Sequence, residues 1–180
     1  MNKNQAGLTL IELLITLGVV SILMSVALPS FQSFTVRNNS IAQISDLMVD
    51  LQFARNEAAK AGVATRICVG NSTGCHTGWG TGWQQGWAVI NNSTGTVLKV
   101  HPEIKSSDVF TSLDGVTLTS SVDFNRYGFS APRVFKLCDQ LDQARAVLLS
   151  RTGRIRLATD TDSPTNGLVD DDATNDITCP

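Results

Sequence analysis

The chain has 180 residues, 42% of them hydrophobic, and a formal net charge of −2. This length supports one folded domain with a single core, and the near-neutral charge gives no global sign of a nucleic-acid binder. The charge is unevenly spread, however: seven basic and two acidic residues at 126–156 precede six aspartates and no base at 160–176.

The chain opens with a short polar leader that ends at Gly7, and a nearly unbroken apolar segment, 8–28, follows it. As a helix, this segment rises about 1.5 Å per residue and reaches about 30 Å, the thickness of a bilayer core. It contains one charge, Glu12. An ionised carboxylate there costs at least about 2.5 kcal/mol to insert, so Glu12 predicts a positively charged partner. An ordinary secretory signal is cut after its apolar core, whereas the leader here ends before it.

The helical pattern continues beyond the apolar segment. Apolar residues recur at three- and four-residue steps and predict an amphipathic helix on a core: Ile41, Ile44, Leu47, Met48, Leu51 and Ala54. Pro29 lacks a backbone donor, so we expect a kink or local loosening there. Ala61-Gly62 predicts the helix end, because glycine accepts the left-handed cap. The predicted N-terminal helix therefore covers 8–62, with 8–28 as its transmembrane part.

After Gly62 the apolar pattern alternates, which predicts a β-rich globular domain over 63–180. Short strands separated by Gly, Asn and Ser clusters are expected at 63–69, 87–90, 97–100, 116–119, 134–138, 144–149 and 154–157. The segment 71–86 is expected to form a loop or an irregular hairpin. The predicted fold class is α+β: a long N-terminal helix packed on an antiparallel, two-sheet β domain.

The four cysteines are Cys68, Cys75, Cys138 and Cys179. The N-terminal segment directs this domain across a membrane, and an oxidising compartment favours disulfides. Three pairings are possible. We favour Cys68–Cys75 as a local link and Cys138–Cys179 as a clamp on the C-terminal tail. A zinc site is the weaker alternative, because no CxxC pair occurs and the two histidines are scattered.

Two further features have competing interpretations. Trp79, Trp83 and Trp87 stand at four-residue spacing among glycines. They would either stack on single-stranded nucleic acid or, as we favour, pack the loop onto the sheet. The aspartates of 160–176 would either bind Ca²⁺ or remain solvated, and their spacing is not that of an EF-hand. The chain lacks a nucleophile elbow, a P-loop and an HExxH motif, so we expect no enzymatic activity, cofactor or metal.

The most specific candidate binding site is the stretch 147–157, which predicts two strands joined by a tight turn at 151–153. Side chains alternate along a strand, so Arg154 and Arg156 share one face about 6.6 Å apart, while Ile155 and Leu157 take the other. Two guanidinium groups at this separation suit the phosphates of a nucleic-acid backbone, without sequence preference.

Arg151, on the turn, would add a third phosphate contact. The alternatives are a solvated strand edge, where basic side chains discourage aggregation, or pairing with the aspartates of the tail.

The N-terminal residues GLTLIELL, 7–14, resemble the processing site of type IV pilins and type II secretion pseudopilins. The resemblance implies that prepilin peptidase removes the leader 1–7 by cutting between Gly7 and Leu8, and that Leu8 is then methylated. It also implies that Glu12 pairs with the N-terminal amine of a neighbouring subunit. Leu8 departs from the family's usual phenylalanine.

The whole chain resembles the GspH/FimT group of minor pilins and pseudopilins. The segments that carry this resemblance are GLTLIELL, FNRYGFSAP at 124–132, LCD at 137–139 and SRTGRIR at 150–156. In FimT-type minor pilins a GRxR motif is associated with DNA binding during natural transformation. Here Gly153, Arg154 and Arg156 match it.

The resemblance implies a minor pilin that is held in the bacterial inner membrane, with its globular domain in the periplasm, until it joins other pilins in a pilus. Such a protein would bind DNA and support pilus assembly and natural transformation. The alternative is a structural, GspH-like pseudopilin of a type II secretion system with no nucleic-acid role.

Overall fold

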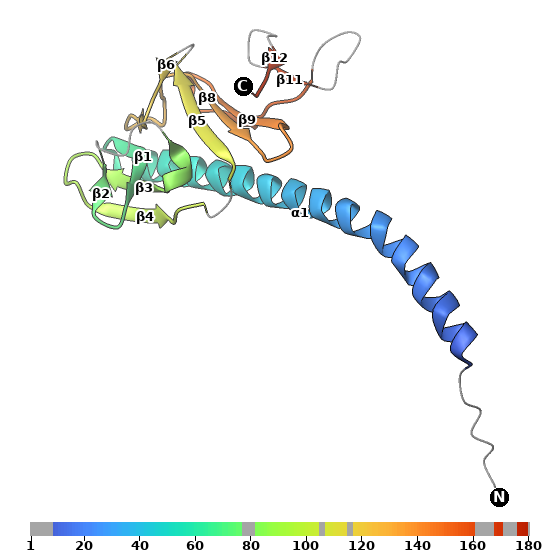
Figure 1. The fold of residues 1–180 in the computed structure, drawn as a ribbon. Helices are drawn as coiled ribbons and strands as arrows, with labels where there is room; N and C mark the ends of the chain where they lie inside the picture. The colour runs from blue at the N-terminus through green and yellow to red at the C-terminus, as the bar shows by residue number, and fades with distance from the viewer. Residues whose placement is uncertain are drawn as a thin grey trace, which may run out of the picture.

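The computed structural model describes residues 9–76, 82–104, 107–114, 117–160, 168–170 and 176–179 (Figure 1), with 113–114 and 117–118 described by their backbone alone. Gly7 and Leu8, at the predicted cleavage site, and Trp79 lie outside these ranges.

One long helix, α1 (Leu10–Ala61), forms the N-terminal part. Thr9 caps its start, since the Thr9 hydroxyl accepts a hydrogen bond from the Glu12 amide at 3.3 Å. The helix ends where it was predicted to end, and Gly62 takes a left-handed φ of 66°. The helix continues across Pro29, because one missing donor leaves the flanking backbone hydrogen bonds intact. Figure 1 shows that α1 curves along its length.

The C-terminal half of α1 packs on the β domain. Its buried residues are Ser40, Ile44, Leu47, Asp50, Leu51, Ala54 and Ala58. The predicted stripe is confirmed except at Ile41, which is 43% exposed. Ile41 is about 100° around the helix from Ser40, which is the residue buried in its place.

The strands form two antiparallel sheets and one small additional pair. The first sheet has the order β2-β1-β3-β4, and β7 also pairs with β1. Its strands are β1 (Thr65–Asn71), β2 (Gly74–Cys75), β3 (Trp87–Asn91), β4 (Val97–His101) and β7 (Ser121–Phe124).

The second sheet has the order β10-β9-β8-β5-β6. Its strands are β5 (Val109–Asp114), β6 (Thr117–Leu118), β8 (Arg133–Cys138), β9 (Ala144–Leu149) and β10 (Ile155–Leu157). The C-terminal pair consists of β11 (Val169–Asp170) and β12 (Asp176–Ile177), and a 3₁₀ turn, η2 (Trp83–Gln85), precedes β3. The predicted fold class is confirmed, although β5, β7, β11 and β12 were not predicted as strands.

The main core lies between α1 and the two sheets, and it contains Trp83 and Trp87. Both indoles are fully buried, and the packing interpretation is confirmed for them. The Trp87 indole N–H donates to the Asp50 carboxylate at 2.8 Å, and Lys99 pairs with the same carboxylate. This buried acid is therefore satisfied by two partners, as a buried charge requires.

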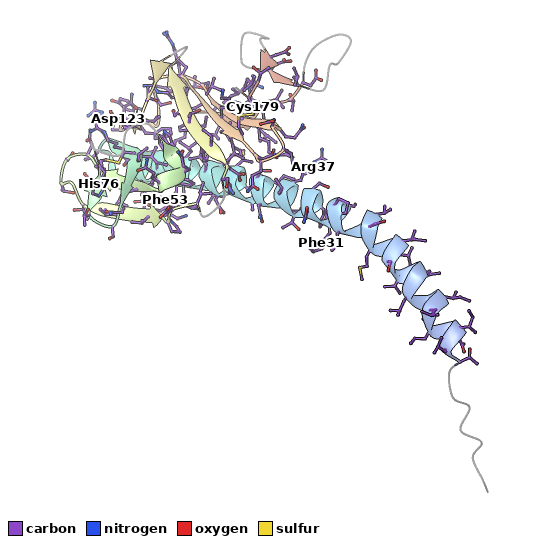
Figure 2. The ribbon with its side chains drawn as sticks, in the orientation of Figure 1. Phe31, Arg37, Phe53, His76, Asp123 and Cys179 are labelled. Atoms are coloured by element: carbon purple, nitrogen blue, oxygen red, sulfur yellow. A yellow bond between two sulfur atoms is a disulfide. The ribbon has the colours of Figure 1, made fainter. Side chains whose placement is uncertain are left out.

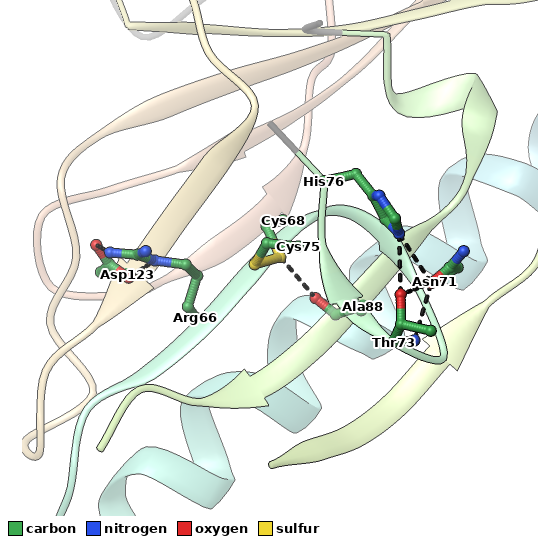
Figure 3. The surroundings of a disulfide bond; sticks show 8 residues. All are labelled: Arg66, Cys68, Asn71, Thr73, Cys75, His76, Ala88 and Asp123. Atoms are coloured by element: carbon green, nitrogen blue, oxygen red, sulfur yellow. Dashed lines mark hydrogen bonds and ion pairs between the residues drawn. A yellow bond between two sulfur atoms is a disulfide. The ribbon is translucent and has the colours of Figure 1, made fainter. Parts of the chain in front are cut away.

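Two disulfides join the pairs that the sequence favoured. Cys68–Cys75 links β1 to β2, next to the Asn71–Thr73 turn (Figure 3). Cys138–Cys179 ties the end of the tail to β8. Figure 3 also shows the Arg66–Asp123 pair, which bridges β1 and β7 at 2.7 Å. The hydrogen bonds that the Arg66 guanidinium donates to the Asp123 carboxylate raise the pKa of Arg66 above its usual value.

Candidate functional site

The N-terminal half of α1 is apolar and is not covered by the rest of the chain. Every large apolar side chain from Leu10 to Phe34 is between 48% and 76% exposed. Figure 2 shows side chains projecting from this part of the helix beyond the globular domain, with Phe31 labelled on it. By length and composition, α1 is the one helix in the described part of the chain that is able to cross a membrane. A surface of this kind requires a bilayer or other apolar helices around it.

Glu12 lies in the first turn of α1, within this apolar surface. The next charged residue along the helix is Arg37, about 37 Å further on. A cationic partner for Glu12 therefore has to come from outside α1. The helix N-terminus itself also favours a carboxylate at this position, because backbone N–H groups there lack acceptors.

The predicted arginine hairpin forms between β9 and β10. Leu149 pairs with Ile155, and the turn is closed by a hydrogen bond from the Gly153 amide to the Ser150 carbonyl at 2.9 Å. The Ser150 hydroxyl accepts a further bond from the Arg154 amide at 3.1 Å. The tight turn thus lies where the sequence placed it.

Arg154 and Arg156 line one open hollow of about 530 Å³, together with Leu148, Ser150 and Thr152. Ile155 points to the other face and packs against the main core. The structure therefore places both arginines on one face of the second sheet. Leu157 pairs with Val147, whose side chain lies in the main core, and Leu157 itself is 45% exposed on the edge strand β10.

The turn is held by parts of the chain that the sequence analysis did not connect with it. The Ser130 amide donates to the Arg151 carbonyl at 3.2 Å, and Arg55 of α1 donates to the Thr152 carbonyl at 3.2 Å. Gly153 has a φ of 72°, and a Cβ on it would lie 1.9 Å from the Gly128 carbonyl oxygen. Glycine in the GRxR pattern is therefore required by the turn and by its close packing on the loop 125–130.

Other basic residues of the second sheet do not join this surface. Arg145 and Arg133 lie on the face that carries the main core, and Arg145 donates to the Ser40 hydroxyl at 3.4 Å. Lys136 lies on the outer face, but its ammonium donates to the Thr178 carbonyl of the tail at 3.1 Å. The candidate site therefore consists of the hairpin and its immediate neighbours.

The described part of the tail folds back on the outer face of the second sheet. Val169 and Ile177 pack in a second cluster with Ala146 and Leu148. Leu148 also lines the arginine hollow, so the tail and the hairpin share this face. Three of the six aspartates of the calcium alternative, Asp162, Asp171 and Asp172, lie outside the described residues.

A long N-terminal helix with an exposed apolar half, packed on antiparallel sheets, defines the pilin-like class of proteins. Comparison with known families agrees. Residues 2–28 match the prokaryotic N-terminal methylation motif, and residues 43–153 match the family of the type II transport protein GspH. The second match covers more than half of the chain, and the chain therefore belongs to the GspH family of minor pilins and pseudopilins.

Individual proteins are similar to parts of the chain. The type IV major pilin protein PilE1 of Neisseria gonorrhoeae is 47% identical over 49 residues, which are 27% of each chain. The chain thus spans about a quarter of the length of its curated relatives. The crystal structure of the type IV minor pilin FimU of Pseudomonas aeruginosa is similar in fold. Its TM-score is 0.55 at 22% identity, over 70% of this chain and 92% of that one.

Proposed function

We propose that this chain is a minor type IV pilin that waits in the bacterial inner membrane and then enters a pilus with other pilins. The observation that carries the proposal is the uncovered apolar half of α1 with one carboxylate, Glu12, in its first turn. A bilayer covers this surface before assembly, with the globular domain in the periplasm. Sister helices cover it in the fibre.

Maturation provides the missing partner of Glu12. Prepilin peptidase cuts between Gly7 and Leu8, and the new N-terminus at Leu8 is methylated. The terminal amine of one subunit then pairs with Glu12 of its neighbour. In the low dielectric of a helix bundle this attraction is much stronger than in water, so it favours subunit entry in the correct register.

The same protein binds DNA through the hairpin formed by Arg151, Gly153, Arg154 and Arg156. Three observations support this activity. Arg154 and Arg156 share one hollow, the turn is held rigidly by neighbouring segments, and Arg55, which contacts the turn, lies far from the membrane. Along α1, Arg55 is roughly 40 Å beyond Leu28, the end of the apolar segment. The hairpin would thus be displayed well away from the bilayer, where phosphate contacts capture DNA of any sequence.

DNA binding by the full-length protein in detergent tests this proposal. Removing both charges, Arg154→Gln with Arg156→Gln, should weaken binding to a labelled duplex. It should also reduce the slope of log K against log salt by about 0.9 for each lost phosphate contact. The matched control, Arg37→Gln with Arg66→Gln, removes two charges elsewhere and should leave the slope nearly unchanged. If the hairpin variant binds as tightly as the wild type, the hairpin is not the site.

A second candidate is a structural pseudopilin of a type II secretion system, and the match of residues 43–153 to the GspH family favours it. In that case the basic hairpin would be an ordinary surface or a contact with another pseudopilin. A deletion strain separates the two candidates. Loss of natural transformation with normal secretion supports the pilin, and the reverse result supports the pseudopilin.

A further inference from the structure

We propose that the DNA surface extends from the arginine hairpin onto an aromatic platform, formed by Tyr127 and Phe129, that stacks exposed bases. The protein then prefers single-stranded DNA to duplex DNA. This inference rests on the proposed DNA binding and names the form of DNA that the site selects. Tyr127 is 62% exposed and Phe129 is 49% exposed.

The loop that carries the two rings is internally fixed. The Asn125 side-chain oxygen accepts hydrogen bonds from the amides of Tyr127 and Phe129, at 2.9 and 3.1 Å. The Asn125 amide donates to the Phe129 carbonyl at 2.8 Å, and the Gly128 amide donates to the Asn125 carbonyl at 2.8 Å. The backbone that carries the rings is thus preorganised, so the loop loses little conformational entropy when a ligand binds.

The same loop is attached directly to the arginine turn. Ser130, the residue after Phe129, donates from its amide to the Arg151 carbonyl and from its hydroxyl to the Ser150 carbonyl. The Gly128 carbonyl packs against Gly153 so closely that no Cβ fits between them. The aromatic loop and the arginine hairpin therefore form one rigid unit.

Arg126 orients the tyrosine. Its guanidinium lies over the Tyr127 ring, with Cζ 4.8 Å from the ring centroid, and donates to the phenolic oxygen at 2.6 Å. A cation on one face of the ring leaves the opposite face for a base. It also adds a positive charge to the loop that carries the two rings.

Together these groups match the two parts of a nucleic-acid strand. Arginines contact the phosphates, and aromatic rings stack on the bases, a combination typical of single-strand binding sites. In a duplex the base faces are already stacked on one another, so only the phosphate contacts remain available. The geometry therefore favours a strand whose bases are free.

Binding of the full-length protein in detergent to three labelled oligonucleotides of equal length tests the inference. The probes are oligothymidylate, a duplex, and an abasic single strand that keeps the phosphates but has no bases. We expect oligothymidylate to bind about 5- to 150-fold more tightly than the abasic strand, the range that base–aromatic stacking provides. We also expect it to bind more tightly than the duplex.

The variants Tyr127→Leu and Phe129→Leu keep an apolar side chain and lose the ring. Each should bring the affinity for oligothymidylate toward that for the abasic strand, without changing the latter. Leu98→Ser on β4 removes another exposed apolar side chain and should have no effect. The fluorescence of the buried tryptophans verifies that each variant is folded.

Three outcomes would overturn the inference. If the wild type binds all three probes equally, or if both ring variants keep the preference, the platform does not stack bases, although DNA binding by the hairpin still stands. If the ring variants bind DNA normally but are depleted from fibres, the loop contacts another pilin instead. If the wild type binds none of the probes, the proposed DNA binding fails together with the platform.

Discussion

Gly153, in the turn between β9 and β10, tests how the arginine hairpin is held. Its φ of 72° lies in the left-handed region, where an L-residue costs about 1–2 kcal/mol. A Cβ would also meet the Gly128 carbonyl oxygen at 1.9 Å, and such overpacking costs about 1–3 kcal/mol. Alanine lowers the entropy of the unfolded chain and recovers about 0.4–1 kcal/mol. Gly153→Ala should therefore reduce the free energy of unfolding by roughly 1–5 kcal/mol.

Gly62 provides the matched control, because its φ is 66° but an added Cβ has nothing within 4 Å. Gly62→Ala should reduce the free energy of unfolding only through the left-handed backbone, by about 1 kcal/mol after the same correction for the entropy of the unfolded chain. Urea unfolding of the full-length protein in detergent, followed by the fluorescence of Trp83 and Trp87, measures both losses. Equal losses, or a smaller loss at Gly153, would refute the close packing of the turn on the loop. Gly153→Ala should also weaken DNA binding, although it removes no charge.

Substitutions at three other places in the chain should have measurable effects. Asp50→Ala should destabilise the domain by about 3 kcal/mol, because it leaves the indole of Trp87 without its acceptor and Lys99 without its ion pair, whereas Asp50→Asn should cost less. Urea unfolding measures both, and an equal cost would contradict the pairing account. Replacing Cys138 and Cys179 by serine opens a loop with a sequence separation of 41, which predicts a loss of about 4 kcal/mol in the same assay. Glu12→Gln should leave the protein in the membrane but reduce its share in sheared fibres about tenfold or more, as seen by immunoblot, while Glu12→Asp should retain most of it.

Features with a strong local signal were predictable from the sequence. The helix end at Ala61 follows from the glycine after it, and β8 and β9 follow from short segments rich in apolar residues that turn residues separate. The strand β5 (Val109–Asp114) was missed because its apolar and polar residues do not alternate regularly and one of its buried residues is a serine, Ser112. This segment forms a strand because it pairs with β8, and that pairing depends on the tertiary structure rather than on the local sequence.

In the arginine hairpin, too, the local features were predictable from the sequence and the tertiary contacts were not. The strand period predicted that Arg154 and Arg156 share a face, since this depends only on their spacing. Which face carries the core is set by packing, so the local sequence did not show that Arg145 points toward α1. The contact between Gly128 and Gly153 joins segments that are distant in sequence, so the local sequence does not predict it. The turn residues Asn125 and Gly128 were the only local signal of a fixed loop at this position.

The most direct test of the proposed assembly is mass spectrometry of fibres sheared from the native host. Identification of the N-terminal peptide establishes both where the chain is trimmed and whether it has entered the fibre. Our account predicts that the chain is present in the fibre fraction and begins at methylated Leu8. A chain that still begins at Met1, that begins beyond Pro29, or that is confined to the membrane fraction would contradict it.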